Sequence, residues 1–282
     1  MPAHAPLFPA RIGLGTWKMG EADSARTREI AAVTHALEVG YRLIDTAEMY
    51  GHGNAERIVG AALQSFGVAR RAELCIVSKV LPGNASRSGT VSACEASLRR
   101  LGCEYLDVYL LHWHGSESFE DTLRGFAELL RRGLIRAYGV SNLDLAELEQ
   151  WRDAERALGS GTSLRCNQLF YCLQARTIEF DVLPWQRAHG IETMAYSPLG
   201  RGELLRHPLL LQIARERGVS AAEVALAWCI RDSDVVAIPK SVHPKRIEEN
   251  LRASQLQLST SDLRRLDQAF PPPHSKRPLP MI

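Results

Sequence analysis

The chain has 282 residues, 45% of them hydrophobic, which allows the large buried core that α/β barrels of this length build as one domain. A formal net charge of +2, without a basic stripe, argues against nucleic acid as a partner, and no apolar stretch reaches the roughly 18 residues of a membrane helix. Residues 1–10 lack the pattern of a secretory leader, so we expect one cytoplasmic domain over residues 1–282 with a small-molecule substrate.

Eight apolar runs of strand length alternate with longer segments of helical period, a pattern typical of βα units around a parallel sheet. The runs cover residues 12–17, 41–45, 74–79, 107–112, 137–142, 166–171, 192–197 and 235–241. The helical segments cover residues 24–39, 55–66, 90–101, 119–132, 145–158, 178–189, 221–231 and 244–253, with extra helices near 204–217 and at the end. This order predicts an α/β fold, a single (β/α)8 TIM barrel with extra helices.

Glycines and short polar residues mark the expected helix ends. Glycines follow four helical segments where a left-handed residue commonly ends a helix: Gly40, Gly102, Gly133 and Gly190. Asp144, and one of Asp23 and Ser24, stand where an N-cap side chain belongs. The prolines at 271–273 predict a stop, followed by a short polar tail over the surface.

No metal or disulfide framework is expected. The six cysteines include no Cys-x-x-Cys pair and no spacing typical of zinc ligands, so they are interpreted as reduced packing residues. His112 and His114 lie two apart on a strand but lack a third ligand at a sensible spacing.

Four polar residues of complementary types stand at or just beyond the ends of strand-like runs: Asp45, Tyr50, Lys79 and His112. Taken singly, such an Asp is usually a turn or cap residue, such a His packs in the core, and such a Lys reaches to water. Because chemistry in a TIM barrel collects at the C-terminal ends of the strands, the four together predict one catalytic site.

The quartet suits reduction of a carbonyl. A phenol with a pKa of about 10 donates a proton at neutral pH only if its phenolate is stabilised, and Lys79 is expected to lower the pKa of Tyr50 for that purpose. Asp45 would keep Lys79 charged, and His112 would donate a hydrogen bond to the carbonyl oxygen. No serine or cysteine nucleophile with a general base is evident, so a cofactor should bring the nucleophile, and a hydride donor fits.

The cofactor site does not follow the Rossmann pattern, because Gly13, Gly15 and Gly20 have the wrong spacing for Gly-x-Gly-x-x-Gly. The last strand instead opens a helix that carries Lys245 and Arg246. A helix N-terminus with nearby cations suits a phosphate group. Without its place after the last strand of a barrel, this segment would be interpreted as a solvated basic start of a helix.

Three segments resemble signatures of the aldo-keto reductase superfamily, in the order found there. They are GYRLIDTAEMYG at 40–51, LDVYLLHW at 106–113, and IPKSV at 238–242 followed by Arg246 and Asn250. The resemblance covers nearly the whole chain. It implies an NADPH-dependent reductase with the catalytic tetrad Asp45, Tyr50, Lys79 and His112, in which Tyr50 donates the proton.

The resemblance also implies where NADPH binds. Ser141, Asn142 and Gln168 would bind the nicotinamide carboxamide, and Tyr196 would stack on the ring. Ser197, Leu199 and Gly200 would cover the pyrophosphate. Lys240, Ser241 and Arg246 would hold the 2′-phosphate, a charge-assisted contact that favours NADPH over NADH, with Asn250 near adenine. Gly15, Thr16 and Trp17 would complete the cofactor site, and Trp17 and Trp113 would line the substrate pocket.

Two departures from the family concern the substrate. His114 stands where the family often has proline, and both the 115–118 loop and the tail after Phe270 are short, which predicts an open pocket. The overall pattern is similar to bacterial members that reduce methylglyoxal and other small aldehydes, and a monomer is expected. Two alternatives stay open: an NADPH-binding regulatory or redox-sensing subunit with little turnover, and a phosphate-handling isomerase or lyase in which Lys79 forms a Schiff base.

Overall fold

The computed structural model describes residues 6–159 and 161–282, and its strands form one eight-stranded sheet in the order β1 to β8, each parallel to its neighbour. The strands are β1 (Leu14–Gly15), β2 (Leu43–Asp45), β3 (Cys75–Val80), β4 (Leu106–Leu111), β5 (Ile135–Ser141), β6 (Cys166–Phe170), β7 (Glu192–Tyr196) and β8 (Val235–Ala237). A parallel bridge between Ile12 and Ala237 joins the first strand segment to the last and closes the ring. The predicted (β/α)8 barrel is confirmed.

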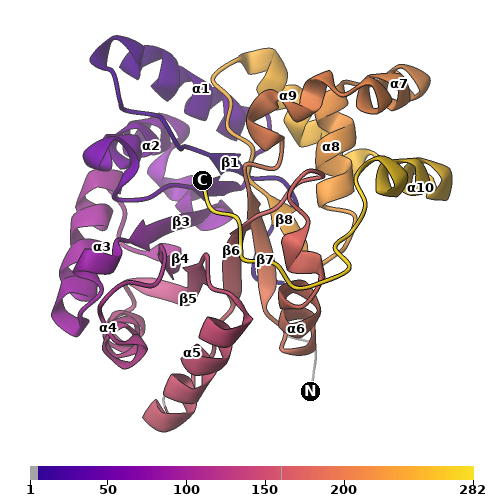
Figure 1. Cartoon of the computed structure of the whole chain (residues 1–282). Helices are drawn as coiled ribbons and strands as arrows, with labels where there is room; N and C mark the ends of the chain where they lie inside the picture. Colours follow the sequence, from indigo (N-terminus) through magenta and orange to yellow (C-terminus); the bar gives the residue numbers. More distant parts are fainter. Residues whose placement is uncertain (1–5, 160) are drawn as a thin grey trace.

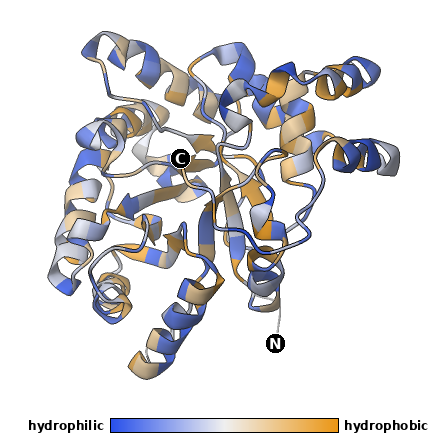
Figure 2. Ribbon diagram, in the orientation of Figure 1, coloured by the Kyte–Doolittle hydropathy of each residue, from blue (hydrophilic) through white to orange (hydrophobic). Residues whose placement is uncertain are grey.

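Helices surround the strands on the outside (Figure 1). They are α1 (Arg26–Glu38), α2 (Asn54–Phe66), α3 (Arg87–Leu101), α4 (Phe119–Arg131), α5 (Leu145–Leu158), α6 (Val182–Ala188), α7 (Pro208–Arg217), α8 (Ala221–Cys229), α9 (Pro244–Arg252) and α10 (Thr260–Ala269). The extra helices predicted near 204–217 and at the end are α7 and α10. Most helices carry both hydrophilic and hydrophobic residues (Figure 2), as expected for one face on the sheet and one in water, whereas α8 is mostly hydrophobic and buried.

The first and last strands are shorter than predicted. Beyond Gly15 the chain turns, with the amide of Met19 donating to the Thr16 carbonyl, so β1 has only two residues. Pro239 has no N–H to donate to a ladder, and β8 ends at Ala237 instead of reaching 241.

The predicted helix ends are confirmed with one exception. All four glycines have positive φ, between 64° and 113°, and Asp144 caps α5 in a capping box with Glu147. The N-cap predicted at Asp23 or Ser24 is wrong. Both residues lie inside a 3-10 turn that leads directly into α1, so the helical hydrogen bonds begin before the position where either side chain would cap.

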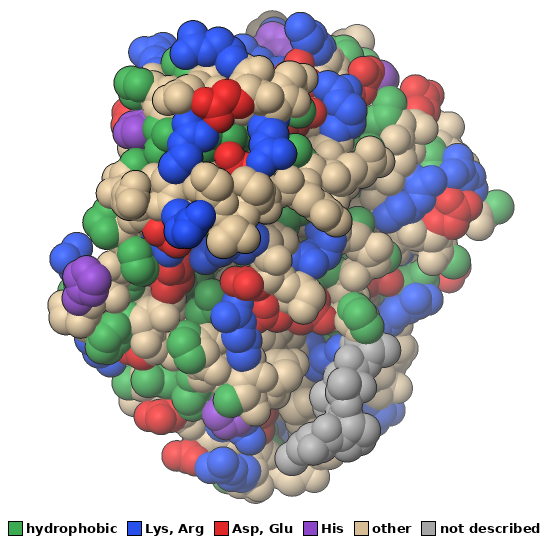
Figure 3. Space-filling view, turned by 90° about the vertical axis from the view of Figure 1, so that its right-hand side faces the viewer, with side chains coloured by type: hydrophobic (Ala, Val, Ile, Leu, Met, Phe, Trp, Pro, Cys, Tyr) green, Lys and Arg blue, Asp and Glu red, His purple; other side chains and the backbone are tan. Residues whose placement is uncertain are grey.

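The core has two layers, which follow from the alternation of side chains along each strand. On β4, Val108 and Leu110 fill the barrel interior, whereas Tyr109 and Leu111 pack outward against the helices. Phe8, from the segment before β1, packs with the interior cluster. On the face drawn in Figure 3, lysines and arginines lie interspersed with aspartates and glutamates.

Candidate active site

Six of the predicted site residues stand in the interior register of the barrel, at or just beyond the C-terminal ends of the strands. Asp45 follows interior Leu43 by two residues on β2, and Lys79 follows interior Val77 by two on β3. His112 continues the interior register one residue beyond β4. The same register holds for three further predicted residues: Ser141, Gln168 and Tyr196. An interior position at a strand end is therefore what brings these distant residues together.

The structure brings the four predicted catalytic side chains into one group. The Lys79 ammonium lies 2.8 Å from Oδ1 and 2.9 Å from Oδ2 of Asp45. It also donates to the Thr46 carbonyl at 2.8 Å and to the Tyr50 hydroxyl at 3.2 Å. The rings of Tyr50 and His112 meet edge to face with centroids 5.8 Å apart. All four are buried, with at most 8% of each residue exposed.

Tyr50 is placed by a turn that only glycine permits. It begins the 3-10 turn Tyr50–Gly53, in which Gly51 has a φ of 54°. A Cβ on Gly51 would lie 2.7 Å from the backbone oxygen of Gly20. A larger residue would therefore push the turn away from the loop after β1, which contains Gly20. The glycine after Tyr50 thus fixes the phenol over Lys79.

Burial and charge act in opposite directions on the ion pair. Burial alone would lower the pKa of Lys79, but Asp45 and Tyr50 outweigh it and hold the pKa above its ordinary value. Burial raises the pKa of Asp45, and both Lys79 and Gln168 oppose that rise. Lys79 is therefore a cation aimed at the phenol, and its charge favours the ionised form of Asp45.

The expected effect of Lys79 on Tyr50 is outweighed by burial. Lys79 lowers the pKa of the phenol as predicted, but burial raises it more, and the net pKa lies above the ordinary value. The prediction of a lowered pKa is therefore wrong in its net direction, because burial cannot be read from a sequence motif. Tyr50 stays protonated at neutral pH, as a proton donor must.

His112 is uncharged. Burial and then the positive charge of Lys79 drive the pKa of His112 well below its ordinary value. Its Nδ1 is buried and finds no hydrogen-bond partner among the described residues. A buried lone pair at Nδ1 costs less than a buried unpaired N–H, which favours the tautomer with the proton on Nε2.

The residues predicted for the carboxamide form a connected group. The Ser141 hydroxyl donates to the Gln168 backbone carbonyl at 2.9 Å, and the Asn142 amide donates to the Ser141 oxygen at 3.0 Å. Asn142 accepts from the Tyr196 hydroxyl at 2.9 Å. The Tyr196 ring stacks on Phe170, with centroids 5.7 Å apart. The Gln168 side chain points to Asp45 and donates to its carboxylate at 2.7 Å.

The end of β1 and the loop that follows it lie beside Asp45. Gly15 and Thr16 are buried, and the Thr16 hydroxyl donates to the Asp45 carbonyl at 2.9 Å. A Cβ on Gly15 would meet the Ile238 carbonyl at 2.7 Å, so glycine allows the close approach to the residue that follows β8. Trp17 is half-buried, with the Lys18 ammonium 4.9 Å and the Arg201 guanidinium carbon 5.7 Å from its ring centroid. Sequence reasoning missed Arg201, since nothing in its own segment signals a contact with the first loop.

The segment after β7 has a strained backbone. Ser197 has a φ of 47° and Arg201 a φ of 56°, both in the left-handed region. Leu199 is half-buried, and a Cβ on Gly200 would meet the Gln174 side chain at 2.7 Å. Gly200 therefore lies close against Gln174, where a larger residue would not fit.

Three of the four residues predicted around the adenosine end open or precede α9. Lys240 and Arg246 are exposed, and no ion pair joins either to an acid within the described ranges. Burial of part of its side chain lowers the pKa of Lys240. The buried Ser241 hydroxyl accepts from the His243 amide at 3.1 Å, and Asn250 is buried on α9.

Trp113, predicted to line the substrate pocket, is half-buried, and its ring centroid lies 4.9 Å from that of His112. His114, at the departure from the family pattern, packs its ring at a tilt against Phe119, with centroids 4.2 Å apart, and pairs with Glu147 at 3.1 Å. The 115–118 loop is thereby tied to α4 and α5.

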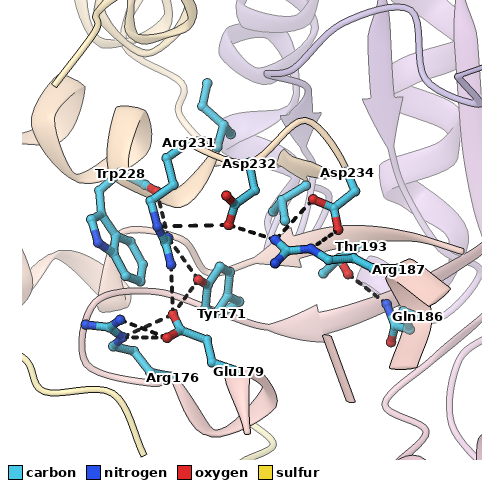
Figure 4. A network of polar contacts seen from close by, with 12 residues as sticks. Tyr171, Arg176, Glu179, Gln186, Arg187, Thr193, Trp228, Arg231, Asp232 and Asp234 are labelled. Carbon is cyan, nitrogen blue, oxygen red and sulfur yellow. Dashed lines mark hydrogen bonds and ion pairs between the residues drawn. The ribbon is translucent and has the colours of Figure 1, made fainter. Parts of the chain in front are cut away.

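The C-terminal tail crosses the mouth instead of leaving it open. Arg176 binds the Phe270 carbonyl and Asp267, which fixes where the tail leaves α10. Figure 4 shows Arg176 and Arg231 both bound to Glu179 in this network. The chain then runs to the centre of the barrel (Figure 1). Burial raises the pKa of Tyr196 to about 12, and the Ile282 backbone beside its hydroxyl opposes the rise.

Residues 6–159 and 161–282 contain neither a candidate metal cluster nor a candidate membrane span. No group of three or more His, Cys, Asp or Glu side chains there is placed to hold a metal ion. No helix in the same ranges is long and apolar enough to span a membrane.

Comparison with known proteins gives consistent matches over nearly the whole chain. A model of the aldo/keto reductase family matches residues 11–270. The methylglyoxal reductase YeaE of Escherichia coli is 43% identical over 277 residues, covering 96% of this chain and 94% of that protein. The glyoxal reductase of Bacillus subtilis is 38% identical over 257 residues, covering 91% and 87%.

Solved structures similar to this chain belong to the same family as the matching family model. An aldo/keto reductase from Klebsiella pneumoniae, in complex with NADP and acetate, has a TM-score of 0.90 at 40% identity and covers 96% of this chain and 95% of that chain. Family, fold and sequence motifs thus point the same way, and the chain belongs to the aldo/keto reductase family.

Proposed function

We propose that this reductase uses NADPH to reduce small reactive aldehydes to alcohols, with methylglyoxal as the first candidate. The observation that carries the proposal is the buried line of contacts from Asp45 through Lys79 to the Tyr50 hydroxyl, beside neutral His112 at the barrel mouth. A proton donor, a fixed cation and a hydrogen-bond donor around one point are what a carbonyl oxygen needs as it becomes an alcohol.

Tyr50 supplies the proton in this proposal. Its raised pKa keeps the phenol protonated, and the proton passes to the carbonyl oxygen as negative charge develops there. The Lys79 ammonium, 3.2 Å from the hydroxyl, stabilises the phenolate that is left. Asp45 keeps Lys79 charged and in place.

His112 orients the carbonyl. As a neutral imidazole with its proton on Nε2, it donates a hydrogen bond to the same oxygen that receives the Tyr50 proton. Two donors on one oxygen polarise the carbonyl and leave its carbon open to attack from the other face.

The donor set at the start of α9 fits NADPH. Lys240 and Arg246 offer two cations without acidic partners among the described residues, and Ser241 adds a hydroxyl, which together suit the 2′-phosphate. Ser141, Asn142 and Gln168 would hold the carboxamide, and Tyr196 would pack on the nicotinamide. When bound, NADPH supplies the hydride. The NADP complex of the Klebsiella relative supports this assignment.

The substrate class rests on the relatives whose names give methylglyoxal and glyoxal as substrates. The proposal also includes a single domain, a monomer and a cytoplasmic location. Five of the six cysteines are buried and all six are free thiols, as is ordinary in a reducing compartment.

The isomerase or lyase alternative is weakened by the surroundings of Lys79. A Schiff-base amine must be reachable and able to lose its proton, but the Lys79 residue is fully buried and its pKa is raised by Asp45 and Tyr50. The regulatory alternative keeps the cofactor site but needs little turnover, so kinetics distinguish it.

The test is NADPH oxidation by the purified protein with methylglyoxal and 4-nitrobenzaldehyde, run beside NADH and beside a sugar and a steroid ketone. Turnover of the small aldehydes with NADPH supports the proposal. Turnover of only the sugar or the steroid would overturn the substrate class, and tight NADPH binding without turnover would favour the regulatory alternative.

A further inference from the structure

Gln168 makes a contact that a role in cofactor binding alone does not explain. It lies on β6 with 2% of the residue exposed, and its side-chain nitrogen is 2.7 Å from Oδ1 of Asp45. Lys79 reaches the same carboxylate from β3. Strands β4 and β5 separate β3 from β6, so the carboxylate is held from two parts of the barrel wall.

The carboxylate decides which way the Gln168 amide points. An amide oxygen 2.7 Å from an ionised oxygen would repel it, so the NH2 group must face Asp45. The donor end then serves Asp45 and the Met194 sulfur, which also lies 2.7 Å from the nitrogen, and the carbonyl end is the part left to accept a hydrogen bond from the cofactor carboxamide. One side chain thus touches the proposed cofactor position and the catalytic ion pair.

We propose that Gln168 is a positioning residue that holds the Asp45 carboxylate in register with Lys79 and so keeps the ammonium aimed at Tyr50. The inference rests on the proposed function and adds to it a link between the cofactor site and the proton donor. A glutamine suits the place because it gives a hydrogen bond to a buried carboxylate without adding a charge. The charged groups facing it are Asp45 and Lys79.

Two substitutions separate positioning from simple packing. Gln168→Leu removes the donor, and we expect kcat at saturating NADPH to fall about tenfold at every pH, as for the loss of a hydrogen bond to a charged group. Gln168→Glu has nearly the same shape, and its protonated form can donate an O–H to Asp45 where the amide donated an N–H. Its ionised form places two carboxylates together. The kcat of Gln168→Glu relative to wild type should therefore rise as the pH falls.

A second readout needs neither cofactor nor turnover. The carboxyl introduced by Gln168→Glu faces Asp45, so its pKa in the folded protein lies above the unfolded value of about 4.3. The stability it contributes is complete below that unfolded value and is lost as the pH rises through the folded pKa. The Tm of the cofactor-free variant relative to wild type should fall between about pH 5 and 8. Gln64→Glu, on the exposed surface of α2, is the matched control and should show no such slope.

The outcomes are distinct. If Gln168→Glu shows no more pH dependence than Gln168→Leu in both kcat and Tm, Gln168 does not act through Asp45. Wild type without turnover on any carbonyl would remove the proposed function, while the Tm comparison would still decide whether Gln168 serves Asp45. If Gln168→Leu does not fold, Gln168→Met, which keeps the length of the side chain, replaces it.

Discussion

Replacing Lys79 by methionine should destabilise the protein strongly, because it leaves the buried Asp45 carboxylate without its cation. Lys79 is fully buried, and the substitution removes the contacts of its ammonium with Asp45, the Thr46 carbonyl and Tyr50. Breaking a buried ion pair by removing one partner costs about 3–5 kcal/mol. Gln168 still donates to Asp45, which places the expected loss near the lower figure, about 3 kcal/mol.

Urea unfolding followed by circular dichroism measures this loss in Lys79→Met and in the double variant Asp45→Asn/Lys79→Met. The double variant removes both charges, so we expect it to be more stable than Lys79→Met alone. In Lys79→Met, burial raises the folded pKa of Asp45 above its unfolded value of about 3.9, so the stability from that group is lost as the pH rises. A loss below about 1 kcal/mol, with simple additivity in the double variant, would refute the picture of a coupled buried pair.

Three further substitutions test other parts of the site. Arg246→Ala should raise the Kd for NADPH about tenfold or more and leave NADH binding unchanged, since only the 2′-phosphate loses a charge-assisted contact; equal effects on both would contradict the assignment. His112→Phe should lower kcat/KM about 100-fold, and in the wild type no loss of activity between pH 6 and 8 should trace to His112, because its pKa lies well below 6.5. A histidine titration in that range in the pH profile, absent from the variant, would count against a neutral His112. Deletion of residues 277–282 should change KM for bulky aldehydes more than for methylglyoxal, and identical KM values would show that the tail does not line the pocket.

The positions of the catalytic residues could be predicted because they depend on local pattern. Alternation places Asp45, Lys79 and His112 in the interior register, and the end of each apolar run places them at the mouth. The helix ends marked by glycine could also be predicted from the sequence. The N-cap predicted at Asp23 or Ser24 was wrong, because residues 23–25 form a 3-10 turn that runs directly into α1, and the local sequence does not reveal that turn.

What escaped prediction depends on contacts far apart in the sequence. The bond between Gln168 and Asp45 joins residues 123 positions apart, and the tail, which Arg176 binds at Phe270, ends with Ile282 beside Tyr196. The net pKa of Tyr50 depends on how deeply the ring is buried, whereas the sequence reveals only that a lysine is near. All three depend on the folded arrangement of segments that are distant in the sequence.

The central claim is that Tyr50 gives the proton, and the most direct measurement compares kcat and NADPH affinity in Tyr50→Phe and wild type. Phenylalanine keeps the ring beside His112 and removes only the hydroxyl that Lys79 contacts. The account predicts a loss of kcat of about 100-fold or more with nearly unchanged NADPH binding. Turnover of a small aldehyde at the wild-type rate by Tyr50→Phe would contradict it.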